Sequence, residues 1–98
     1  MTQDAVKKAL TSIIDPELGV NIVDLGLVYD VQFRGGAVKV TMTLTTPACP
    51  LDDYFRKAIE EALRKVPGVV SVEVVFTFEP LWDRSRMSEA ARLQLGIR

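Results

Sequence analysis

The stretch LVYDVQFRGGAVKVTMTL, residues 27–44, consists of two segments of alternating apolar and polar residues with two glycines between them. Glycine readily adopts the positive φ angles of two-residue turns, so the pattern predicts a β-hairpin with Gly35 and Gly36 in the turn. A one-residue slip would set apolar side chains opposite polar ones. The register that matches the apolar faces has four pairs, which are Phe33–Val38, Val31–Val40, Tyr29–Met42 and Leu27–Leu44.

Segments with helical periodicity flank this hairpin. Residues 2–14 place apolar side chains on one helical face, and the proline of Asp15-Pro16 ends the pattern. Residues 50–66 show the same spacing, with acids four residues before bases on the opposite face. Residues 69–78 alternate again and predict a third strand, with Val70 on its apolar face. A short last helix is expected to begin at Ser88 and to close at Gly96.

The predicted order is therefore αββαβα, an α/β protein of the α+β type. Half-polar strands indicate a two-layer sandwich, in which helices cover one face of a small mixed three-stranded sheet. The long helix between the second and third strands predicts that these two strands are parallel. A length of 98 residues suits a single domain spanning residues 1–98. Its core is expected to contain Val40, Met42, Phe55, Ile59, Leu63, Val72 and Val74.

Composition argues against several classes of protein. The net charge of −1 lacks the basic excess that drives binding to nucleic acid. The N-terminus, MTQDAVKKAL, has no signal-peptide pattern, and no apolar run reaches the ~20 residues that span a bilayer. We therefore expect a cytoplasmic protein with neither a nucleic-acid nor a membrane partner.

The single cysteine, Cys49, lies between Pro47 and Pro50 in the segment TTPACP. Pro50 suits the first position of the helix that follows, which places Cys49 at or near its N-cap, where the helix dipole favours a thiolate. The alternative is a small buried hydrophobic residue, which is what free cysteine usually is. With no histidine in the chain, no complete catalytic constellation is present, and one soft ligand cannot close a zinc or iron–sulfur site.

Acidic residues are frequent in the loop before the first strand. Asp15, Glu17 and Asp24 have the chemistry of acids, bases or hard-metal ligands, but Asp15-Pro16-Glu17 is also an ordinary turn, and Asp24 is placed to cap its own loop. We expect this loop to lie against the start of the helix at residues 50–66. That arrangement would bring Asp15 or Glu17 near Cys49.

Five segments together resemble a known family: DPEL (15–18), NIVDLGLVYDV (21–31), MTLTTPACPL (42–51), GVVSVEVVF (68–76) and PLW…MSEAARLQLG (80–96). They are similar to the PaaD-like and SufT-like iron–sulfur cluster assembly domain, a metal–sulfur cluster biosynthetic factor. The same family includes the eukaryotic cytosolic iron–sulfur targeting factor. PaaD proteins carry an additional cysteine-rich C-terminal part, which this sequence lacks, so the stand-alone branch is expected.

The resemblance implies an accessory factor in iron–sulfur cluster assembly or delivery rather than an enzyme. Implied partners are scaffold or carrier proteins, including Mrp/ApbC-type P-loop ATPases, and client apoproteins. A homodimer, which would bring two Cys49 thiols together, is a further expectation. Cys49 would be a transient ligand of a labile cluster that is shared between chains or with a partner and is not held stably by one chain. The implied site comprises Asp15, Glu17, Leu18, Thr45, Thr46, Cys49 and Trp82.

Two other functions stay open at this point. A cysteine-independent adaptor would bind a partner protein through Trp82 and the basic stretch from Arg84 to Arg86. A thiol-dependent enzyme would use Glu17 or Asp15 as the base for Cys49.

Overall fold

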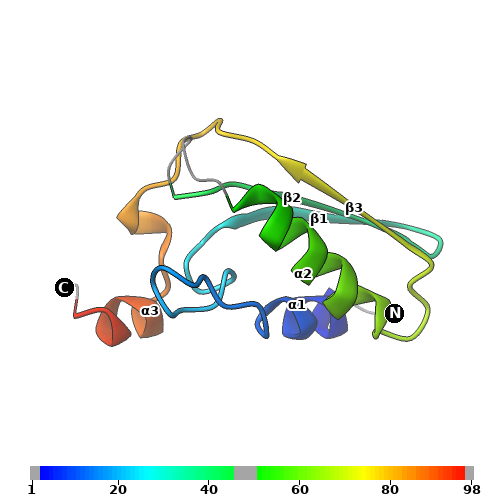
Figure 1. Ribbon diagram of the computed structural model, residues 1–98, viewed down its shortest axis with the longest axis horizontal. Helices are drawn as coiled ribbons and strands as arrows, with labels where there is room; N and C mark the ends of the chain where they lie inside the picture. The colour runs from blue at the N-terminus through cyan, green and yellow to red at the C-terminus, as the bar shows by residue number, and fades with distance from the viewer. Residues whose placement is uncertain (1–2, 46–50, 97–98) are drawn as a thin grey trace.

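The computed structural model describes residues 3–45 and 51–96 (Figure 1). The predicted order of helices and strands is confirmed, with one short 3-10 helix (η1) added before the last helix. In chain order the elements are α1 (Gln3–Leu10), β1 (Val28–Arg34), β2 (Ala37–Met42), α2 (Asp52–Arg64), β3 (Ser71–Phe76), η1 (Arg84–Arg86) and α3 (Glu89–Gln94).

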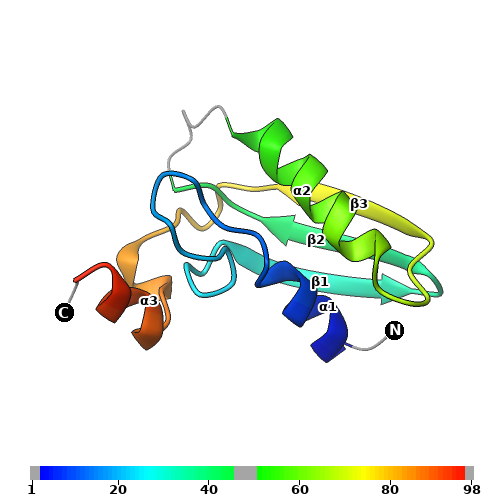
Figure 2. The ribbon, with the colours of Figure 1, turned by 60° about the horizontal axis from the view of Figure 1, so that its bottom comes forward.

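The sheet has the strand order β1-β2-β3. Strands β1 and β2 are antiparallel, whereas β2 and β3 are parallel, so the predicted mixed sheet is confirmed. Helices α1 and α2 lie on one face of this sheet, and α3 lies beside the loop that joins α1 to β1 (Figures 1 and 2). Among the described elements, none covers the opposite face.

The predicted hairpin register is confirmed near the turn and wrong at its far end. Val31 faces Val40 and Phe33 faces Val38, as expected. A β-bulge at Tyr29 then shifts the register, so that Val28, not Tyr29, lies opposite Met42. The shift also separates the predicted pair of Leu27 and Leu44, because the amide of Thr43 now bonds to the carbonyl oxygen of Leu27 at 2.8 Å.

The bulge is explained by contacts that Tyr29 makes far along the chain. Its hydroxyl donates to the carbonyl oxygen of Pro80 at 2.8 Å, and the guanidinium of Arg86 lies 4.7 Å from the centre of its ring. A bulge adds one residue to one strand and re-aims a side chain, here towards the C-terminal segment.

Several predicted boundaries differ from the structure. Helix α1 ends at Leu10 instead of residue 14, because the hydroxyls of Thr11 and Ser12 donate back to carbonyl oxygens three residues earlier. The predicted start of α1 at residue 2 lies outside the described residues, whereas the predicted start of α2 at residue 50 is wrong, because Leu51 is the N-cap and the helix begins at Asp52. Strand β3 is shorter than predicted and leaves Val70 83% exposed.

The predicted core residues pack together between the helices and the sheet. Six of the seven are buried, and Val72 is half-buried and packs against them. The loop between α1 and β1 adds a second group that is at most 2% exposed, consisting of Val20, Ile22, Leu25 and Leu27. This loop is therefore part of the core and not a loose connection. Within the described residues, no helix is long and apolar enough to cross a membrane.

Candidate functional site

The loop that carries DPEL is closed on itself by backbone hydrogen bonds. The amide of Ile22 donates to the carbonyl oxygen of Ile13 at 3.0 Å, and the amide of Asp15 donates to that of Val20 at 2.9 Å. Between these bonds the chain turns back at Gly19, whose φ angle is 72°. The result is a fixed turn at residues 15–20.

Asp15 stabilises this turn from inside. Its side chain is 3% exposed, and Oδ1 accepts hydrogen bonds from the amides of Glu17 at 2.8 Å and Leu18 at 3.2 Å. Both donors lie within three residues, which is the turn chemistry that the sequence left open as an alternative. Glu17 is exposed, and Leu18 is half-buried against the core.

The other predicted site residues fall in three places. Thr45 is half-buried in the segment that follows β2, and Trp82 is half-buried against the core. Thr46 and Cys49 lie outside the described residues, so their places in the site stay predictions. The structure adds Thr43, which is fully buried although the strand alternation placed it on the polar face. Strand β2 ends at Met42, so Thr43 lies just beyond the strand, where the alternation no longer applies.

The first turns of α2 contact the DPEL loop. The hydroxyl of Tyr54 donates to the carbonyl oxygen of Ile14 at 3.4 Å, one residue before Asp15. This bond confirms the prediction that the loop lies against the start of the second helix. The predicted approach of Asp15 or Glu17 to Cys49 involves a residue outside the described part of the chain and remains a prediction.

The C-terminal segment supports the same loop from another side. Indole Nε1 of Trp82 donates to the carbonyl oxygen of Leu25 at 2.7 Å. The backbone amide of Ser88 donates to the carbonyl oxygen of Asp24 at 2.7 Å, and Nε2 of Gln94 donates to the carbonyl oxygen of Gly19 at 3.2 Å. The only polar atom of the Trp82 side chain therefore forms its hydrogen bond within the molecule. Sequence reasoning placed Trp82 near the site but had no signal for the two other contacts, which span 64 and 75 residues (88 − 24 and 94 − 19).

Gly26 shows how closely the loop and the C-terminal segment approach. Its φ angle is 77°, and a Cβ atom at this position would lie 2.2 Å from the carbonyl oxygen of Arg86. Only glycine fits here, because any side chain would meet the backbone of η1.

Within the same loop, the side chains of Asn21 and Asp24 bond to each other. Asn21 Nδ2 donates to the Asp24 carboxylate at 2.8 Å, and Asn21 Oδ1 accepts from the backbone amide of Asp24 at 2.9 Å. The side chain that caps this loop is therefore that of Asn21, and the Asp24 carboxylate holds the Asn21 amide in place.

One carboxyl group near the site has a shifted pKa. The hydroxyl and amide of Ser85 both donate to Asp83, and these bonds hold the pKa of the Asp83 carboxyl below its ordinary value of 3.8. The bonds also fix the start of η1, whose N-cap is Asp83. Among the described residues, no three His, Cys, Asp or Glu side chains gather to hold a metal ion.

The chain belongs to the iron–sulfur cluster assembly protein family, whose model matches residues 3–74. It is 43% identical to an Fe-S protein maturation auxiliary factor of Porphyromonas gingivalis, covering 98% of this chain and 92% of the relative. It is 38% identical to the Fe-S protein maturation auxiliary factor SufT of Staphylococcus aureus, covering 87% and 98%. The predicted SufT-like family is confirmed, and these relatives are named auxiliary factors and not enzymes.

Two further likenesses concern a longer protein and a fold. An iron–sulfur cluster carrier protein of Synechocystis is 44% identical over 87% of this chain, which corresponds to 24% of the carrier's length. The crystal structure of a domain of unknown function from Bacillus anthracis superimposes with a TM-score of 0.91 at 40% identity, covering 98% of this chain and 92% of that one. The chain therefore shares its fold with this domain.

Proposed function

We propose that this protein is an accessory factor in iron–sulfur cluster assembly or delivery, and that Cys49 is its transient ligand for the cluster or for a partner's thiol. The observation that carries the proposal is the family's match over residues 3–74, which include both DPEL and TTPACP. The names of the relatives support the same role.

The ligand count favours delivery over storage. The chain has one cysteine and no histidine, whereas iron–sulfur clusters are commonly held by four cysteine thiolates. The remaining ligands must therefore come from another molecule. A cluster bound in this way is labile, which suits a protein that passes its cargo on.

The role that we assign to the DPEL loop is to position groups beside the segment that carries Cys49. Asp15 holds the turn, and Glu17 is left exposed next to it. The thiol must lose its proton to bind iron. The first turn of α2 has opposing effects on this step, because its dipole favours a thiolate while Asp52 and Asp53 disfavour one.

The partners that we propose are cluster carriers of the Mrp/ApbC P-loop type, together with client apoproteins. A segment similar to this chain makes up part of a longer carrier protein, which supports a domain of this kind acting beside the remaining parts of such a carrier. The adaptor alternative has less support, because the indole N–H of Trp82 bonds within the molecule and Arg86 stacks on Tyr29.

The test is complementation of a host that lacks this gene. We expect Cys49→Ser to leave the fold intact but to reduce the activity of iron–sulfur enzymes in those cells, because serine lacks the soft sulfur that iron favours. Ala48→Ser is the matched control, since it adds the same hydroxyl one residue away and retains the thiol. Normal enzyme activity with Cys49→Ser, at protein levels equal to those of the control, would exclude the proposed ligand role.

A second measurement separates the two remaining functions from this one. A thiol-dependent enzyme would show turnover that depends on Cys49 without any cluster donor present. An adaptor would retain partner capture in the Cys49→Ser variant and restore client activity as the wild type does. The proposed function, in contrast, requires both a cluster donor and the Cys49 thiol for client activity.

A further inference from the structure

The two edges of the sheet are protected to different degrees. At the β3 edge, Nη1 of Arg56 donates to the carbonyl oxygen of Val74 at 2.9 Å, and the guanidinium lies 5.3 Å from the centre of the Phe76 ring. This side chain reaches over from α2 and occupies the middle of the edge. Covering an edge in this way is one means by which proteins prevent strands of other molecules from pairing there.

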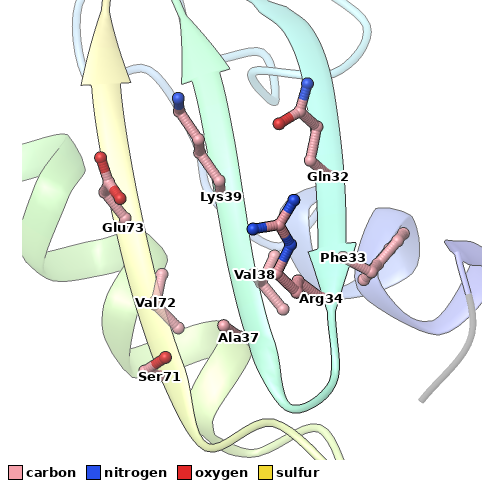
Figure 3. A pocket seen from close by; sticks show the side chains of 9 residues that line it. All are labelled: Gln32, Phe33, Arg34, Ala37, Val38, Lys39, Ser71, Val72 and Glu73. Atoms are coloured by element: carbon pink, nitrogen blue, oxygen red, sulfur yellow. The ribbon is translucent and has the colours of Figure 1, made fainter.

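The β1 edge is open by comparison. Strand β1 is the outer strand of the sheet, and no other strand of the described residues pairs with its free side. Gln32, Phe33 and Arg34 are exposed, and Phe33 retains 38% of its surface. Figure 3 shows the Phe33 side chain beyond β1, on the side away from β2. An unprotected strand with an exposed aromatic side chain is suited to pairing with another strand.

The hairpin turn fixes which backbone groups face this open edge. Gly35 and Gly36 form the turn, so Arg34 and Ala37 are the pair that closes it with a hydrogen bond. Hydrogen-bonded and non-bonded pairs alternate along an antiparallel ladder. Gln32 therefore also bonds to β2, and Val31 and Phe33 direct their N–H and C=O groups towards solvent.

Strand β1 is complementary to itself when two copies run antiparallel. With the two-fold axis at Gln32, Val31 faces Phe33 of the second copy, and both residues offer the backbone groups that an added strand requires. In the same register Asp30 faces Arg34 of the second copy. Asp30 and Arg34 share the outer face with Gln32, whose Nε2 bonds to Asp30 Oδ2 at 3.0 Å. Opposite charges therefore meet on one face of the joined sheets, and apolar side chains meet on the other.

We propose that two copies of this chain pair through their β1 edges and form one continuous six-stranded sheet. The interface is isologous, so pairing uses up both open edges and closes at a dimer. The bulge at Tyr29 limits the paired stretch to residues 30–34, because it interrupts the regular ladder. A short paired stretch of this kind gives a dimer that dissociates at low concentration.

This dimer has a consequence for the cysteine that does not depend on the proposed function. Antiparallel pairing about Gln32 places the two Met42 ends of β2 at opposite ends of the joined sheet, and each TTPACP segment follows one of these ends. A cluster bridged by the two Cys49 sulfurs is therefore not formed within this dimer. Any additional ligands must come from a different molecule.

The test is the sedimentation velocity of the full 98-residue chain from micromolar to sub-millimolar concentrations. We expect the wild type to dimerise reversibly. Asp30→Arg and Arg34→Asp should each raise the dimer dissociation constant about tenfold or more, because each sets like charges opposite each other at two symmetric places. The double variant Asp30→Arg/Arg34→Asp restores both pairs and should recover the wild-type constant.

The matched controls reverse a charge on the same outer face of the sheet, but on strands other than β1. Lys39→Glu on β2 replaces a positive charge by a negative one, as Arg34→Asp does. Glu73→Lys on β3 replaces a negative charge by a positive one, as Asp30→Arg does. Figure 3 shows Lys39 and Glu73 on the same outer face of the sheet as Gln32. The controls should dimerise as the wild type does. A wild type that is monomeric throughout, single variants that dimerise normally, or a double variant that fails to recover would each overturn the proposal.

Discussion

The two ends of the sheet are built in different ways. At the hairpin end the chain reverses at Gly35 and Gly36, and the nearby Val70 is 83% exposed. At the other end, where β2 leaves the sheet, a long buried loop is held by side chains from α2 and from the C-terminal segment. The hairpin end has a distant backbone partner, since the carbonyl oxygen of Gly36 accepts from the amide of Val70 at 2.7 Å, whereas the loop end is held by several distant side chains. The proposed site lies at the second end.

The largest contrast between the two ends should appear when a buried side chain is truncated. Leu25 is fully buried in the loop, so Leu25→Ala should lower the free energy of unfolding by about 2–5 kcal/mol. Val70→Ala at the hairpin end should change it by less than about 0.5 kcal/mol, because most surface changes do. Denaturant unfolding followed by circular dichroism measures both. Equal losses would show that the loop end is not the more tightly packed one.

An intermediate effect is expected from the contact between Trp82 and the loop. Trp82→Phe retains an aromatic ring but removes the indole N–H, leaving the Leu25 carbonyl oxygen without that donor, and should cost about 1–3 kcal/mol. Leu81→Ala is the neighbouring control, because Leu81 is 63% exposed. If Trp82→Phe unfolds at the same denaturant concentration as the control, the C-terminal segment does not brace the loop through this bond.

A smaller effect concerns Asp83 at the start of η1. Its carboxyl pKa is lowered in the folded protein, so the contribution to stability is present above the unfolded value near 3.8 and is lost as the pH falls through the lower folded value. Ser85→Ala removes the hydroxyl bond and should raise the Asp83 pKa towards its ordinary value. A titration of the carboxyl carbon by NMR measures this shift. An unchanged Asp83 pKa in Ser85→Ala would mean that the hydroxyl bond is not its cause.

The same contrast explains how much could be predicted from the sequence. The hairpin turn, the parallel crossover and the order of elements follow from local periodicity and glycine placement, and the structure confirms them. The bulge at Tyr29 could not be predicted, because its cause is a contact with Pro80, 51 residues away. Likewise, the acids of the DPEL loop suggested chemistry, but local patterns did not show that Asp15 is buried and bonded to two amides of its own turn.

The buried Thr43 is the clearest case in which a local rule failed. Alternation placed it on the polar face, yet β2 ends at Met42, and Thr43 is buried just beyond the strand, where its amide bonds to the carbonyl oxygen of Leu27. Alternation applies only while the chain remains a strand, so a predicted strand that extends past the real end assigns the next residue to a face it does not occupy. The family resemblance, in contrast, predicted the family without any geometry, and the family's match over residues 3–74 confirms it.

We propose that the loop end forms one site with the segment that carries Cys49, and a spin label tests this arrangement directly. The chain has a single cysteine, so a nitroxide spin label can be attached to Cys49 with no substitution elsewhere. We predict strong paramagnetic broadening of the amide signals of Glu17, Leu18 and Gly19. The amides of Gly35 and Gly36 should remain sharp, because the 7 residues of β1 separate the two ends by about 20 Å. Sharp signals from Glu17 and Leu18 in the labelled protein would contradict a shared site.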